Sequence, residues 1–210
     1  MKRWLRDNGL TLTLMLVFLL SILGMAIAGF AHESRELALH GEAPPRFLAY
    51  LGSGTFVSAV FENWESEFLQ MSAYVMLTAF LFQRGSAESL DPDDPHRPGD
   101  TPPARLRGRI RRWLYSYGLG LSLAGLFVLS FTIHWLASAA AANEEAARHG
   151  GEITSVVSYL FDPLLWFESF QNWQSEFLST AMLIVLSIFL RFKGSPESKP
   201  VSAPHGQTGA

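Results

Sequence analysis

The sequence contains no cysteine, and only 17% of its 210 residues are charged. Without cysteine, disulfides and thiol chemistry are excluded. The chain has no Gly-rich phosphate loop, no G-x-S-x-G motif and no kinase signature. A formal net charge of −3 gives no reason to expect nucleic acid as a partner. We therefore expect a protein without enzymatic activity, without a cofactor and without a nucleic-acid partner.

A nine-residue motif occurs twice, as F-E-N-W-E-S-E-F-L at 61–69 and as F-Q-N-W-Q-S-E-F-L at 170–178. The copies differ only where Glu is exchanged for Gln, and their offset is 170 − 61 = 109 residues. The same offset, without a gap, aligns Trp4 with Trp113 and His40-Gly41 with His149-Gly150. Because matched polar residues at one fixed offset do not arise from low complexity, the pattern indicates duplication of one unit.

Each half begins with a long apolar run. Leu10–Phe30 carries no charge, and Leu114–Ala142 is its counterpart. About 20 apolar residues are enough to cross a bilayer. A cleaved signal peptide is the alternative for the first run, but its counterpart lies in the middle of the chain. The second runs, Phe68–Phe82 and Phe177–Leu190, are shorter, so we expect their helices to begin earlier, inside the motif.

The pattern predicts an all-α integral membrane four-helix bundle, made of two tandem helical hairpins of the same orientation. Residues 1–90 form the first two-span repeat and 105–193 the second. The Pro- and Asp-rich segment 91–104 is expected to be a disordered linker, and 194–210 a disordered tail. We also expect a short helix in each outer loop, capped by Ser34 and Asn143 and ended by Gly41 and Gly150.

The distribution of charge predicts the orientation in the membrane. Lys and Arg gather near both termini and around the linker, where Arg105–Arg112 is strongly basic. Since excess Lys and Arg marks the cytoplasmic side, both termini are expected to be cytoplasmic and the protein to lie in the plasma membrane. The lipid bilayer is the expected partner, and a homo-oligomer is compatible with this arrangement.

Three stretches, MKRWLRDNGL, F-E-N-W-E-S-E-F-L-Q and A-F-L-F-Q-R-G-S-A-E-S, resemble an uncharacterised family of small bacterial membrane proteins. That family is a domain of unknown function, and the resemblance covers the whole chain. It implies an integral membrane protein with no assigned activity and supplies no catalytic residues.

Polar residues of the motif are candidates for a site within the bundle. On a helix, Asn63 and Glu67 share one face, as do Asn172 and Glu176. These residues either hydrogen-bond across helices and cap helix ends, or form a paired-Glu site for a proton, a cation or a cationic solute. Glu62 and Glu65 become Gln in the second copy, so we place more weight on Glu67 and Glu176. Two aromatic side chains, Trp64 and Trp173, are expected to anchor the helices at the outer interface.

A metal site is a weaker hypothesis. Two carboxylate–imidazole pairs at i, i+4 spacing could share one ion if the halves meet, although such spacing is common in solvated turns. The pairs are Glu36 with His40 and Glu145 with His149. His134 is the only histidine in its apolar run, and Met25 occupies the matched position in the first half. We expect the His134 side chain to lie in the interior or at the interface with its hydrogen bonds satisfied. The favoured role is that of a structural or accessory membrane component, and the alternative is a small permeation or sensing module.

Overall fold

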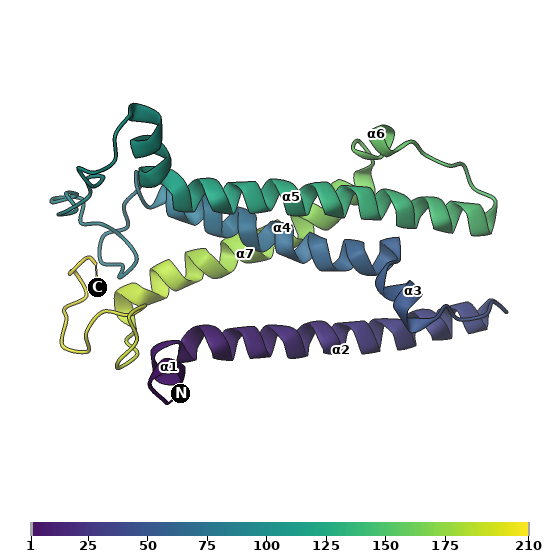
Figure 1. Ribbon diagram of the computed structural model, residues 1–210. Helices are drawn as coiled ribbons and strands as arrows, with labels where there is room; N and C mark the ends of the chain where they lie inside the picture. The colour runs from purple at the N-terminus through teal and green to yellow at the C-terminus, as the bar shows by residue number, and fades with distance from the viewer. Residues whose placement is uncertain (1, 210) are drawn as a thin grey trace.

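The chain is helical without strands over residues 2–209, the part that this computed structural model describes (Figure 1). Four long helices and three short ones follow each other along the chain. They are α1 (Lys2–Asp7), α2 (Gly9–Leu39), α3 (Phe47–Leu51), α4 (Gly54–Leu77), α5 (Arg109–His149), α6 (Val156–Tyr159) and α7 (Pro163–Phe189). The all-helical expectation is thereby confirmed.

Two of the long helices, α2 and α5, have the length and the hydropathy of membrane spans. Their 31 and 41 residues correspond to about 46 and 61 Å at 1.5 Å per residue, which exceeds the bilayer core of about 30 Å. The other two, α4 and α7, have 24 and 27 residues and are also long enough. Because they contain the polar motif, they are less apolar than α2 and α5 and do not have the hydropathy of a membrane span.

Two pairs of helices begin at matched positions in the two halves. For α3 and α6 the offset is 156 − 47 = 109 residues, and for α4 and α7 it is 163 − 54 = 109. Side-chain caps fix the second pair of starts, because Ser53 accepts a hydrogen bond from Phe56 N and Asp162 accepts one from Leu164 N. Both helices therefore begin earlier than their apolar runs, as expected, but they begin before the nine-residue motif and not inside it, because the capping residues precede the motif.

The short outer helices predicted from Ser34 and Asn143 do not exist as separate elements. α2 and α5 continue through both positions, so neither residue is a helix cap. Asn143 instead binds the backbone of Thr154 through its side-chain amide. The predicted ends are right, because the chain turns at Gly41 and Gly150 with φ of +76° and +70°, which favours glycine.

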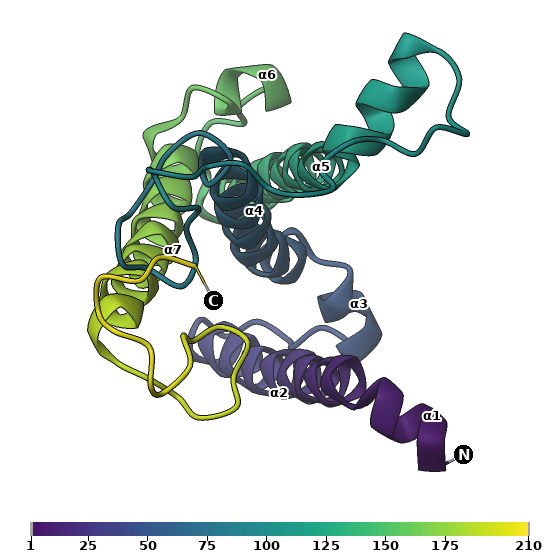
Figure 2. The ribbon, with the colours of Figure 1, turned by 90° about the vertical axis from the view of Figure 1, so that its left-hand side faces the viewer.

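The four long helices run roughly along one direction, and α2 lies at the edge of the group (Figures 1 and 2). Both termini and the segment between α4 and α5 lie at one end, whereas α3 and α6 lie at the other. The helix α4 packs chiefly on α5, and it also contacts α7. A helix of the first half thus has its main partner in the second half.

Small residues bring α4 and α5 close together. A Cβ atom on Gly54 would lie 2.7 Å from the carbonyl oxygen of Ala137 and 2.6 Å from the amide nitrogen of Ala141. One turn further along, the hydroxyls of Ser58 and Ser138 hydrogen-bond to each other. Glycine, alanine and serine at a helix contact, joined by hydrogen bonds between side chains, are typical of packing in membranes.

The distribution of side chains is the reverse of a water-soluble protein. More polar than apolar residues are buried, whereas large apolar side chains of all four long helices are exposed. The accessible surface is 14901 Å², compared with about 9,700 Å² for a soluble globular protein of this mass. A bundle with a polar interior and an apolar surface suits a hydrocarbon environment.

Residues 91–104 and residues 194–209 contain turns in the structure, and the second segment contacts the loop that follows α4. The ammonium group of Lys199 is buried and donates hydrogen bonds to the carbonyl oxygens of Gly85, His205 and Gln207. Gly209 N also donates to Ser86 O at 2.9 Å. The polar tail therefore packs on the loop that follows α4.

Candidate cation-binding centre

One imidazole and three carboxylates meet where α4, α5 and α7 come together. α5 contributes His134, α4 contributes Glu62 and Glu65 one turn apart, and α7 contributes Glu168. The side chains of His134 and Glu65 are fully buried, whereas those of Glu62 and Glu168 are 25% and 28% exposed. These four residues are called the His134 centre below.

The two ring nitrogens of His134 have different surroundings. Nδ1 lies 3.0 Å from Glu65 Oε2. Nε2 lies 3.4 Å from Glu168 Oε2 and 4.0 Å from Glu62 Oε2. Because an ionised carboxylate only accepts hydrogen bonds, the short contact to Glu65 places a proton on Nδ1. When the ring is protonated, Nε2 donates to Glu168 Oε2. When the ring is neutral, the lone pair on Nε2 is directed at the carboxylates of Glu168 and Glu62.

Neighbouring donors hold the carboxylates in place. The indole Nε1 of Trp173 donates to Glu65 Oε1 at 3.2 Å. The hydroxyl of Ser138 donates to Glu168 Oε2 at 3.4 Å. Each carboxylate oxygen in these contacts comes from a different helix than its donor, so the network ties α4, α5 and α7 together.

The His134 centre has an excess of negative charge. With every group ionised, three carboxylates and one imidazolium carry a net charge of −2. A ligand atom from each of Glu62, His134 and Glu168 lies within 4.8 Å of the others. Because uncompensated charge is costly inside a bundle, a cation between these atoms would stabilise the arrangement. Carboxylate and imidazole are also common metal ligands.

The four residues selected from the motif lie outside this centre. The amides of Asn63 and Asn172 donate to backbone oxygens of their own helices, those of Ala59 and Glu168. Glu67 is exposed and Glu176 is half-buried. Within residues 2–209 neither glutamate forms an ion pair.

The two tryptophans expected at the outer interface have unlike surroundings. Trp64 packs on Phe18 and Phe61, with ring centroids 5.9 and 4.9 Å away. Trp173 instead contacts the buried carboxylate of Glu65. The structure therefore gives Trp173 a partner inside the bundle, which its sequence position does not suggest.

The two carboxylate–imidazole pairs do meet, as the weaker metal hypothesis requires. All four residues line one polar cavity of about 250 Å³ between the ends of α2 and α5. The rings of His40 and His149 lie edge to face, with centroids 6.2 Å apart. However, Arg148 lines the same cavity and lies near Glu33 and Glu42. This guanidinium already compensates part of the acidic charge.

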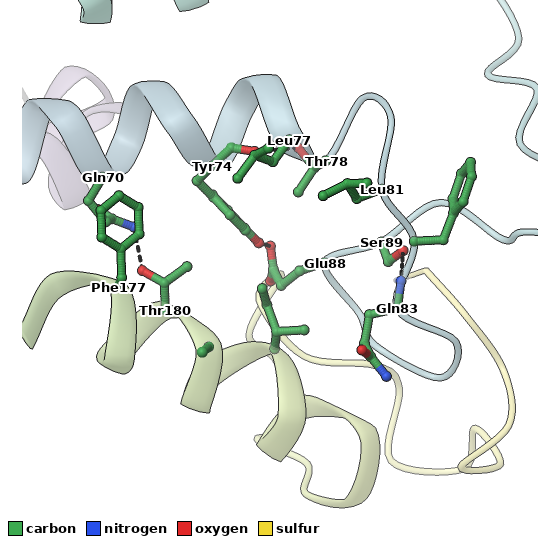
Figure 3. Close-up of a pocket in the computed structure, with 13 residues that line it drawn as sticks. Gln70, Tyr74, Leu77, Thr78, Leu81, Gln83, Glu88, Ser89, Phe177 and Thr180 are labelled. Carbon is green, nitrogen blue, oxygen red and sulfur yellow. Dashed lines mark hydrogen bonds between the residues drawn. The ribbon is translucent and has the colours of Figure 1, made fainter. Parts of the chain in front are cut away.

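A mostly apolar cavity of about 330 Å³ lies between α4 and α7, toward the end with the termini (Figure 3). The amide of Gln70 donates to Thr180 Oγ1, and Tyr74 donates to Glu88 Oε2 at 2.8 Å. The pKa of Glu88 lies above its usual value. Burial raises this pKa most and the carboxylate of Glu197 raises it further, and together they outweigh the hydrogen bond from Tyr74, which lowers it. Glu88 belongs to the segment G-S-A-E-S at 85–89, and Glu197 is the matched residue of G-S-P-E-S at 194–198. The interaction between the two carboxyl groups shows that these segments meet here.

Sequence reasoning missed the His134 centre because it relied on residues shared by both copies. Every ionisable member of the centre has a non-ionisable counterpart: Gln171, Gln174, Met25 and Ala59 stand opposite Glu62, Glu65, His134 and Glu168. The useful signal was the difference between the copies. A lone histidine in an apolar span and two glutamates unmatched in the other half indicated groups with a shared partner.

Comparison with known proteins identifies a family whose function is unknown. No curated protein and no solved structure matches the chain. The model of one family, DUF6766, described as a domain of unknown function, matches residues 1–210. The match covers every residue of the His134 centre and both copies of the motif. The chain therefore belongs to the DUF6766 family.

Proposed function

We propose that the protein is a four-span integral membrane protein that binds a cation within its helix bundle, at the His134 centre, for permeation or sensing. It has no enzymatic activity in this proposal. The observation that carries it is a fully buried imidazole surrounded by three carboxylates from two other helices. Ionisable groups inside a membrane bundle are costly and mark ion pathways.

The membrane location is supported by two helices of sufficient length and hydropathy. The apolar exteriors of α4 and α7 support two further spans. Met71 and Met76 are exposed on α4, and Phe177 and Leu178 on α7. With four crossings, both termini lie on one side, in agreement with their position at one end of the molecule (Figure 1).

The lack of cysteine makes the four-span arrangement easy to test. Single cysteines at Ala43 and Glu152, which are matched exposed positions, should react with an impermeant maleimide from outside intact cells. Cysteines at Thr101 and Ser202 should react only after the cells are opened. Labelling of all four sites from one side would contradict the proposal.

Cation binding is tested by the thermal stability of the protein in nanodiscs, since a ligand that binds only the folded state raises the melting temperature. Sodium, potassium, magnesium, calcium, manganese and zinc are compared. At least one should stabilise the parent, and Glu62→Gln/Glu168→Gln should abolish that gain. Glu67→Gln is the matched control and should keep it. No stabilisation of the parent by any cation would refute the cation site.

Permeation and sensing are separated by flux into proteoliposomes. A stabilising cation that also enters vesicles holding the parent, but not those holding Glu62→Gln/Glu168→Gln, supports permeation. Binding without flux supports sensing.

A further inference from the structure

We propose that the cation is a divalent transition metal, coordinated by His134 Nε2 and by the carboxylates of Glu62 and Glu168. Glu65 is the positioning residue of this site. The inference rests on the proposed function, because it names the class of cation that the same centre takes.

The first step is the orientation of the imidazole. The contact of 3.0 Å between Nδ1 and Glu65 Oε2 fixes the proton on Nδ1. The lone pair on Nε2 is then directed at Glu62 and Glu168. A carboxylate on the far nitrogen orients a metal-binding histidine and makes it more basic. Trp173 orients Glu65 in turn, through its hydrogen bond of 3.2 Å.

The second step is the spacing of the ligand atoms. Metal–ligand bonds of about 2.1 Å at tetrahedral angles place neighbouring ligand atoms about 3.4 Å apart. Nε2 lies 3.4 Å from Glu168 Oε2 and 4.0 Å from Glu62 Oε2. All three ligand atoms lie within 4.8 Å of one another. The Glu62 side chain is 25% exposed, and its carboxylate would have to approach Nε2 by about 0.6 Å to reach the tetrahedral spacing.

The third step is the choice of metal. Magnesium and calcium favour sites made only of oxygen atoms, whereas an imidazole nitrogen suits zinc, iron and copper. The charge of the centre also favours a divalent ion. With a neutral His134, the three carboxylates carry −3, and a divalent ion reduces this to −1. A monovalent ion would leave −2. One imidazole and two carboxylates also leave a coordination position free for water or another ligand.

The experiment uses the full chain in nanodiscs, purified with a tag that contains no histidine. All samples carry His40→Ala and His149→Ala, which remove the two imidazoles that line the polar cavity between the ends of α2 and α5. Zinc binding is measured by calorimetry. We expect one zinc per chain. His134→Gln, Glu62→Gln and Glu168→Gln should each weaken binding at least tenfold, whereas Glu67→Gln should leave it unchanged. Equal affinity in the parent and in His134→Gln would overturn the inference.

The role of Glu65 needs a readout that a structural role would not change. Copper(II) is added as a spectroscopic probe, and pulsed electron paramagnetic resonance detects the remote nitrogen of a bound imidazole. We expect one imidazole, whose remote-nitrogen coupling shifts in Glu65→Gln because the hydrogen bond to Nδ1 changes. Glu65→Gln should also weaken zinc binding about 10- to 100-fold. An unshifted coupling would remove Glu65 from the positioning role.

Two outcomes separate this inference from the proposed function. If calcium or sodium stabilises the parent through Glu62 and Glu168 while zinc and copper do not bind, the transition-metal inference fails and the cation site stands. If no cation binds, both fail. The copper spectrum is recorded on the protein that keeps His134, so a His134→Gln protein that does not fold leaves the inference testable. The absence of an imidazole coupling in the parent overturns it.

Discussion

The two halves of the chain share a framework but differ in chemistry. Matched residues make matched local contacts. Ser66 and Ser175 donate to the backbone oxygens of Asn63 and Asn172, and the amides of those asparagines bond to their own helices. The unmatched residues behave differently, because His134 and its three glutamates contact one another across helices.

This difference separates what maintains a helix from what forms a site. A contact within one helix can be repeated in both halves, since it depends only on local sequence. A contact among α4, α5 and α7 depends on how the halves pack. This packing is unequal, because α4 packs extensively on α5, whereas the chief contact of its counterpart α7, with α4, is smaller. The comparison predicts that exchanging unmatched residues for their counterparts has large effects, and that changing matched residues has small ones.

The largest effect is expected for His134→Met, which inserts the residue found at the matched position 25. Removing the imidazole leaves buried carboxylates without their partner, and loss of one member of a buried ion pair typically costs about 3–5 kcal/mol. Denaturant unfolding in mixed micelles measures the change. Met25→Leu is the control and should change stability by less than about 1.5 kcal/mol. A His134→Met protein as stable as the parent would show that the centre is not a buried network.

The next comparison uses the two tryptophans of the motif. Trp173→Phe removes a hydrogen bond to a buried carboxylate, which is worth about 1.5–3 kcal/mol. Trp64→Phe removes no hydrogen bond among the described residues, so it should cost less than Trp173→Phe. The same unfolding assay measures both. Equal losses would contradict the different roles of the two copies.

Close packing gives a third comparison, between two glycines. Gly54→Val places methyl groups against the backbone of Ala137 and Ala141, and overpacking of this kind costs about 1–3 kcal/mol. Gly24 has open space around it, so Gly24→Ala should be neutral or should stabilise the helix by up to about 1 kcal/mol. Thermal unfolding in nanodiscs measures whether each substitution lowers or raises the stability. A neutral Gly54→Val would mean that α4 and α5 lie further apart.

The smallest effect is expected for Glu67→Gln/Glu176→Gln. Both positions lie outside the His134 centre, and Glu67 is exposed. Substitutions away from buried networks usually change stability by less than about 0.5 kcal/mol. Unfolding and zinc calorimetry should both match the parent. A loss of zinc binding would move the site to the residues that the shared motif suggested.

The sequence predicted the parts of the fold that depend on local patterns. The apolar run after Gly9 predicted a long helix, and the glycines at 41 and 150 marked positions where a helix ends, although the pattern assigned them to separate short helices. The shortness of the second runs predicted that their helices begin earlier, but inside the motif and not before it. It did not predict that α2 continues past Ser34. A serine can cap a helix or lie inside one, and the residues around it are good helix formers.

The site was harder to predict because it depends on packing between the halves. Nothing local to Glu65 reveals that its carboxylate meets His134, which is 69 residues away. The pairs Glu36–His40 and Glu145–His149 occupy matched positions, so the sequence could suggest that they share a site if the halves meet there. The centre requires the unequal packing of α4 and α7, and matched residues at one fixed offset give no means of predicting that inequality.

The packing of α4 on α5 has a consequence for biogenesis. In the four-span arrangement proposed above, the first hairpin emerges during synthesis before α5, the chief neighbour of α4. Until α5 enters the bilayer, Glu62 and Glu65 would face lipid or the insertion machinery. The first hairpin, produced alone, should therefore be a substrate for membrane quality-control proteases, and co-expression of the second hairpin should protect it.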